Sequence, residues 1–291
     1  MSPFKIFCIA TRPITCLTAF AGTWAASLLI TSFPVFSKET IIPAIVMGLC
    51  CLASSLFYTG GVPKKARFAP KFIDVPLPQY KGELMLFAGL TFLAAVIIAA
   101  RYLPLIALLF IGMCSFAVVI FTLNTGMTRY WFGKSLNGAI ICASCVSMAG
   151  IHTPPGQELV SLRLPAFIFL FYLLRETLKR IDEAHKNPDL QDMPFKLNDN
   201  EPPFYIGMSG AMRIAAVICL VAGVFFVLLI RLETPHSIPF TICGTLLSFG
   251  LFFTCAWLFL GWEKLYFKGS HHIVTAGTWM LIGASVIHRL Q

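Results

Sequence analysis

Residues 83–123 read ELMLFAGLTFLAAVIIAARYLPLIALLFIGMCSFAVVIFTL, and only Glu83 and Arg101 in this stretch carry a charge. A helix needs about 20 apolar residues to cross the hydrocarbon core of a membrane. The stretch is about twice that length, and its charged break lies near Arg101. It therefore predicts two consecutive membrane-spanning helices, 83–100 and 103–123.

The rest of the 291-residue chain has the same character, with 57% hydrophobic residues, 12% charged residues and a mean hydropathy of +0.80. Soluble domains carry about 25% charged residues, so this chain lacks the surface that water requires. We therefore expect an all-α integral membrane protein in which residues 1–291 form a single domain. Its nine predicted transmembrane helices are 13–31, 41–58, 83–100, 103–123, 136–152, 162–176, 206–230, 239–261 and 271–288.

The distribution of Lys and Arg predicts the orientation of these helices, because basic residues concentrate in cytoplasmic loops. With the N-terminus in the cytoplasm, sixteen of the 22 basic residues lie inside and five lie outside, while Arg213 falls within a predicted helix. We therefore expect a multi-pass protein of the cytoplasmic (inner) membrane. The net charge of +9 suits membrane lipids or a phosphorylated lipid, and nothing in the sequence indicates nucleic acid.

Two long connections, residues 59–82 and 177–205, are both predicted to be cytoplasmic. The first is strongly basic, and seven of the thirteen acidic residues lie between Glu176 and Glu201, at the start of and within the second. Long loops in a compact protein tend to carry function. We therefore expect the functional residues in and beside these two connections.

Four short motifs in this order resemble the UbiA superfamily of intramembrane prenyltransferases. They are Arg12-Pro13 at the start of the first predicted helix, PLPQYKG at 76–82, WFGKSLNG at 131–138 and RETLKRIDE at 175–183. The Gly60-Gly61 pair is similar to the EboC-like branch of that family. The resemblance covers most of residues 10–200 and implies a nine-helix bundle that encloses a cavity open to the cytoplasmic half.

The family's activity implies a reaction and a cofactor for this chain. Family members hold Mg²⁺ on two Asp-rich motifs, and the metal neutralises the diphosphate that leaves a polyprenyl diphosphate. Both motifs are degenerate here, because the first connection has only Asp74 and Arg180 stands at an expected Asp. The resemblance implies catalytic roles for Glu176, Asp182 and Glu183, with Mg²⁺ on Asp182 and Glu183.

Basic residues offer a second way to hold a diphosphate, because Lys and Arg bind phosphate oxygens without a metal. Lys and Arg in the loops also serve as anchors at the lipid headgroups, and Arg213 has the further alternative of reaching back to the interface. For Asn137 the alternative is a helix cap. The predicted diphosphate-binding residues are Lys64, Lys65, Arg67, Lys71, Arg129, Lys134, Asn137, Lys179, Arg180 and Arg213.

Three functions fit these patterns. The first is a prenyltransferase that moves a polyprenyl group from its diphosphate to a lipophilic acceptor. The second is a non-catalytic relative that binds an isoprenoid or lipid, or that serves in a membrane complex or in transport. The third, an unrelated transporter, is disfavoured because the sequence has no internal repeat. Cys142 and Cys145 form a CxxC motif, but its small apolar neighbours favour close helix packing over redox chemistry.

Overall fold

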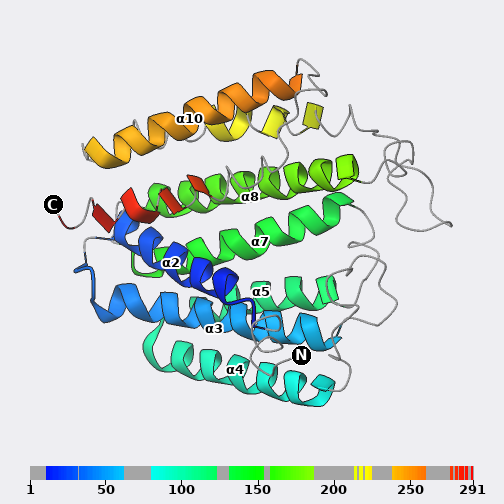
Figure 1. Ribbon diagram of the computed structural model, residues 1–291. Helices are drawn as coiled ribbons and strands as arrows, with labels where there is room; N and C mark the ends of the chain where they lie inside the picture. Colours follow the sequence, from blue (N-terminus) through cyan, green and yellow to red (C-terminus); the bar gives the residue numbers. More distant parts are fainter. Residues whose placement is uncertain are drawn as a thin grey trace.

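The computed structural model forms a bundle of helices, and no strand occurs in the part of the chain that it describes (Figure 1). The described residues are 11–31, 33–61, 80–122, 131–153, 158–186, 213–214, 216–218, 220–224, 238–259, 276–277, 279–280, 282–284, 286–287 and 290.

The first two described helices are α2 (Pro13–Ile30) and α3 (Lys38–Gly61). Proline at the first position of α2 suits a helix start, because its fixed φ is helical and the N–H that it lacks has no partner there. A turn joins the two helices, and the backbone N–H of Ile41 donates to the carbonyl of Ser37 at 3.0 Å as α3 begins.

The quoted stretch forms two helices as predicted, α4 (Lys81–Tyr102) and α5 (Ile106–Thr122). Leu103, the residue before Pro104, is extended with φ −116° and ψ 156°. A residue that precedes proline is disfavoured in the helical region, so α4 ends here and the chain reverses. Pro104 therefore decides where the apolar run divides.

The second half of the described chain contains α7 (Trp131–Ala149), the 3₁₀ turn η3 (Gly150–His152), α8 (Glu158–Lys186) and α10 (Ile238–Phe259). The predicted connection 177–205 begins later than expected, because residues 177–186 continue α8. Six of these ten residues are the strong helix formers Leu, Lys, Arg, Glu and Ala, and the first proline after them is Pro188. The residues described in 213–224 and 276–290 are also helical.

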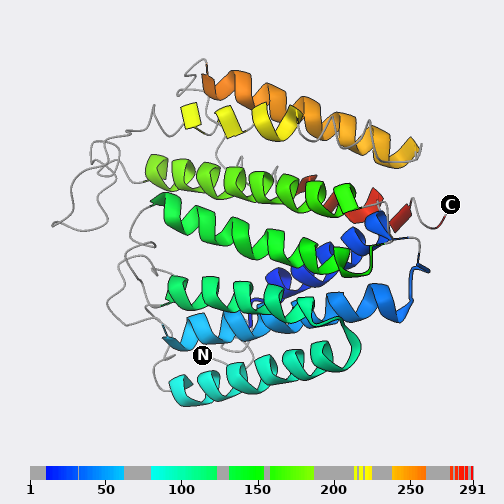
Figure 2. The same ribbon diagram turned by 180° about the vertical axis from the view of Figure 1, so that it is seen from behind.

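Successive helices run in opposite directions across the bundle (Figures 1 and 2). The helices α3, α5 and α8 end, and α4 and α7 begin, at one end of the bundle, which we call the loop end. Helix α3 packs against α2, α4 and α5, and α7 packs against α2, α5 and α8. Both long connections therefore leave the bundle at the loop end. This agrees with the prediction that both lie on the same side of the membrane.

The described helices have the composition of a membrane protein. Three of them, α2, α3 and α4, are long and apolar enough to cross a membrane. Large apolar side chains of α4, among them Leu86, Phe87, Leu90 and Leu93, are exposed, as expected of a face against lipid. The nine-helix count and the cytoplasmic N-terminus stay predictions.

Buried hydroxyl groups in α2 bond to their own helix. Thr23 donates to the Ala19 carbonyl at 2.8 Å, Ser27 to the Thr23 carbonyl at 3.1 Å, and Thr31 to the Ser27 carbonyl at 2.7 Å. Because lipid offers no hydrogen-bond partner, buried polar groups need partners inside the protein. These small residues therefore allow close packing of α2 without leaving a polar group unsatisfied.

Candidate functional site at the loop end of the bundle

The middle of α8, from Tyr172 to Glu176, carries a compact group of three polar side chains. The Arg175 guanidinium forms an ion pair with the Glu176 carboxylate, and the two side chains are 25% and 15% exposed. The same guanidinium lies 5.5 Å from the centroid of the Tyr172 ring. A cation over an aromatic face is attracted by the ring's electrons. Tyr172 and Glu176 thus both fix the position of the Arg175 charge.

Helix α7 packs against this group from the neighbouring position in the bundle. A Cβ atom at Gly138 would lie 3.7 Å from Cγ of Glu176, an ordinary contact distance. One turn further along α7, the Cys142 thiol shares a hydrogen bond with the Tyr172 side chain. The close approach of α7 therefore leaves Glu176 in a confined, partly buried place.

A second arginine lies at the start of α2 in an unusual backbone conformation. Arg12 has φ 47° and ψ 61°, and it is the one non-glycine residue with positive φ in the described part of the chain. Its guanidinium lies 4.9 Å from the centroid of the Tyr58 ring on α3. A left-handed conformation costs a non-glycine residue about 1–3 kcal/mol, and such residues concentrate at functional sites. Arg12 is therefore a candidate functional residue.

Each arginine group has a cysteine beside it, Cys16 of α2 near Arg12 and Cys142 of α7 near Tyr172. The Cys16 thiol donates to the Thr11 carbonyl at 3.1 Å and shares hydrogen bonds with Cys51 and Ser55 of α3. We call Arg12, Tyr58, Tyr172, Arg175 and Glu176 the two-arginine site. The name covers two groups, Arg12 with Tyr58 on α3 and Arg175 with Tyr172 and Glu176 on α8, and each holds one positive charge that suits an anionic ligand.

Most of the predicted site residues lie on the parts of α7 and α8 that are nearer the loop end. Lys134 and Asn137 lie in the first turns of α7, and Lys179, Arg180, Asp182 and Glu183 lie on the continuation of α8 beyond Glu176. The remaining predicted loop residues, Lys64, Lys65, Arg67, Lys71 and Arg129, lie outside the described residues.

Three predictions about individual residues have different outcomes. Asn137 lies six residues after Trp131, inside α7, so the predicted helix cap is wrong. Arg213 is exposed, and within the described residues it forms no ion pair. A charge within a predicted membrane helix needs a partner, and Glu176 and Asp182 are the partners that we predict for Arg213 from the sequence. For Glu176 the structure adds a partner, Arg175, that the sequence analysis did not consider.

The described side chains do not form a metal site. No group of three or more His, Cys, Asp or Glu among them is arranged to hold a metal ion. The carboxylate of Glu176, the one predicted acid whose side chain is described, is paired with Arg175. The side chains of Asp182 and Glu183, the predicted Mg²⁺ ligands, are not among those that the structure describes, so the Mg²⁺ site stays a prediction.

Sequence reasoning missed Tyr58 and Tyr172 and did not assign Arg12 a role. Tyr172 precedes Arg175 by three residues, a spacing that places two side chains on one face of a helix. That spacing was a usable signal. The contact between Arg12 and Tyr58 joins residues far apart in the chain, and no local pattern predicts it.

No family model matches the sequence, and no curated protein matches it either. Among solved structures, the chain is similar to a digeranylgeranylglyceryl phosphate synthase, with a TM-score of 0.71 and 13% sequence identity. The match covers 99% of this chain and 98% of that one. That protein is a membrane prenyltransferase of the UbiA superfamily. The resemblance found in the sequence is thus confirmed at the level of structure, and this chain has the UbiA fold.

Proposed function

We propose that this protein is a membrane prenyltransferase that moves a polyprenyl group from its diphosphate to a lipophilic acceptor. The observation that carries the proposal is the likeness, over almost the whole chain, to a digeranylgeranylglyceryl phosphate synthase. The product named there joins two geranylgeranyl groups to a glyceryl phosphate. The two-arginine site supports the proposal, because a diphosphate is the anion that its charges would bind.

The chemistry requires stabilisation of negative charge. The bond between the allylic carbon and the diphosphate oxygen breaks, and its electron pair leaves with the diphosphate. The acceptor then forms a new bond to that carbon and loses a proton. Arginine binds phosphate oxygens through paired N–H groups, and fixed positive charge at the leaving group lowers the barrier. We assign this role to Arg12 and Arg175.

The predicted basic residues would extend this binding surface. Lys134, Lys179 and Arg180 lie on turns of α7 and α8 at the loop end. Mg²⁺ stays part of the proposal through Asp182 and Glu183, which follow Glu176 on α8. When bound, the metal would neutralise charge on the leaving diphosphate.

The test is binding and turnover of a polyprenyl diphosphate by the purified full chain, with Mg²⁺ and with EDTA. Arg12→Gly removes the guanidinium but tolerates a positive φ, and Arg175→Ala removes the second charge. We expect each variant to bind at least about tenfold more weakly, because a hydrogen bond to a charged group contributes about 1.5–3 kcal/mol. Arg101→Ala, at the other end of α4, is the matched control.

The outcomes separate an enzyme from a binder. Diphosphate release that depends on Mg²⁺ and is lost in Asp182→Ala would support both the activity and the proposed metal residues. Binding in EDTA without turnover would contradict the enzyme and support a non-catalytic isoprenoid-binding protein. If the two arginine variants bind as the Arg101→Ala control does, the two-arginine site is not the diphosphate site.

A further inference from the structure

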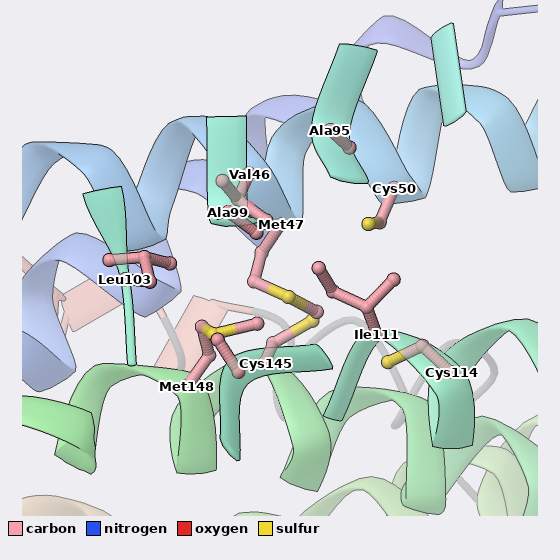
Figure 3. Packing of buried hydrophobic residues seen from close by; sticks show 11 residues of the cluster. Val46, Met47, Cys50, Ala95, Ala99, Leu103, Ile111, Cys114, Cys145 and Met148 are labelled. Atoms are coloured by element: carbon pink, nitrogen blue, oxygen red, sulfur yellow. The ribbon is translucent and has the colours of Figure 1, made fainter. Parts of the chain in front are cut away.

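Sulfur atoms are concentrated in the interior of the bundle. Six of the seven described cysteines lie on α2, α3, α5 and α7, and only Cys243 lies on α10. Two buried methionines join them where α3, α5 and α7 meet (Figure 3). We call this group the sulfur cluster: Met47, Cys50, Cys114, Cys145 and Met148. None of its members is more than 7% exposed.

The geometry points to a binding site for a monovalent soft metal ion, copper(I), in the sulfur cluster, with Met47, Cys145 and Met148 as ligands. Thioether and thiolate sulfur are the ligands that copper(I) prefers. Figure 3 shows these three side chains, from α3 and α7, pointing toward one another within one packed group. Since no three His, Cys, Asp or Glu among the described residues are arranged to hold a metal, the site requires the two thioethers.

The charge of this ligand set suits its depth. Met47 is fourteen residues from the loop end of α3, which places it roughly 20 Å into the bundle at 1.5 Å per residue. Burying a net charge at such depth is costly. One thiolate, one copper(I) and two neutral thioethers sum to zero charge. The Cys145 thiol releases its proton as the sulfur–copper bond forms, so binding releases one proton.

Further thiols lie on the helices that surround this site. Cys16 shares a hydrogen bond with Cys51 of α3, and Cys50, next to Cys51 in the chain, belongs to the sulfur cluster. Cys114 shares a hydrogen bond with Cys145 in the sulfur cluster. Cys16, Cys51 and Cys142 are only partly buried. Copper(I) can move between neighbouring thiols by exchanging one sulfur ligand for the next, without crossing apolar surface as a bare ion.

The experiment is an anaerobic titration of the purified full chain with copper(I) against a chromophoric copper(I) chelator. We expect one ion to bind, one proton to be released, and X-ray absorption to find sulfur alone around the metal. The test variant combines Met47→Leu with Met148→Leu, which nearly conserves volume and preserves packing. We expect its affinity to fall at least about tenfold, since even losing an outer partner of a metal ligand costs 10–100-fold.

Matched controls separate metal ligation from folding. Met113→Leu with Met280→Leu changes two exposed methionines outside the cluster and should bind as wild type does. Cys243→Ser should also leave binding unchanged, whereas Cys145→Ala should abolish it. Thermal unfolding without copper checks that each variant is folded. The proposal is overturned if wild type cannot compete with the chelator, or if the folded double leucine variant binds as tightly as wild type.

Discussion

At the scale of single residues, the pairing of Arg175 with Glu176 bears most directly on function. The carboxylate neutralises a guanidinium that we assign to the diphosphate, and in the family resemblance the same acid has a catalytic role. The two roles predict different responses to the loss of its charge. Both roles agree with the partial burial of Arg175 and Glu176, because a confined charge needs a partner.

Glu176→Gln separates the two roles. The amide keeps the shape of the side chain but leaves the Arg175 charge unopposed, so a diphosphate should bind more tightly in EDTA. We expect a gain of roughly two- to fivefold, the range of a partly exposed ion pair. The measurement is diphosphate affinity in EDTA and turnover in Mg²⁺. Weaker binding in EDTA would contradict the neutralising role, whereas loss of turnover alone would identify Glu176 as a catalytic residue.

At the scale of elements, glycines decide how closely the C-terminal helical segments approach their neighbours. A Cβ atom at Gly223 would lie 3.0 Å from Cε1 of Phe252 on α10. A Cβ atom at Gly277 would lie 2.7 Å from Cδ1 of Leu247, also on α10, and 3.6 Å from Cζ of Phe171 on α8. Small residues allow membrane helices to pack at short distance. The missing side chains of Gly223 and Gly277 thus allow the C-terminal segments to approach α8 and α10 closely.

Gly223→Ala should destabilise the protein, because the new methyl group presses on the Phe252 ring. We expect a loss of about 1–3 kcal/mol, the usual cost of overpacking a core. Gly250→Ala on α10 is the control, since a Cβ atom there has no neighbour within 4 Å. It should leave stability unchanged or raise it by up to about 1 kcal/mol through helix propensity. The measurement is thermal unfolding in detergent. Equal effects of both substitutions would contradict the packing account.

At the scale of the whole molecule, the sequence predicts that most basic residues lie on one side of the membrane. The helix directions bring both long connections to the loop end, which agrees with the prediction that successive loops alternate between the two sides of the membrane. The cytoplasmic position of that end rests on the excess of Lys and Arg.

Reporter fusions test this orientation directly. Fusions joined after Lys64 and after Lys186 should report the cytoplasm. Fusions joined after Lys38 and after Arg289 should report the opposite side, because each follows an odd number of predicted helices. Lys186 and Lys38 on the same side of the membrane would refute the topology.

The charge of the first long connection leads to a test in salt. If its lysines bind the diphosphate, Lys64→Ala with Lys65→Ala should weaken binding in EDTA, and the affinity should depend less on salt than in wild type. The reason is that salt screens exposed charges beyond about 10 Å at 0.1 M. If the lysines only anchor the loop at lipid headgroups, affinity and salt dependence should match wild type. The measurement is diphosphate affinity across a salt series.

The sequence by itself determined the class of the protein and much of its helix order. Apolar length, the charged break near Arg101 and the motif order are local properties, and a helix in lipid satisfies its backbone within one segment. The all-helical membrane architecture and the UbiA fold followed from them, and both are confirmed. The continuation of α8 to Lys186 was missed, since its charged residues were interpreted as a loop.

Only the tertiary structure decided which side chains meet. Arg12 reaches Tyr58 on another helix, and Met47 meets Cys145 and Met148 across the bundle. Such contacts depend on the rotation and depth of each helix relative to its neighbours. The apolar pattern does not fix either quantity, because in lipid an apolar face suits a neighbouring helix and a lipid chain equally well.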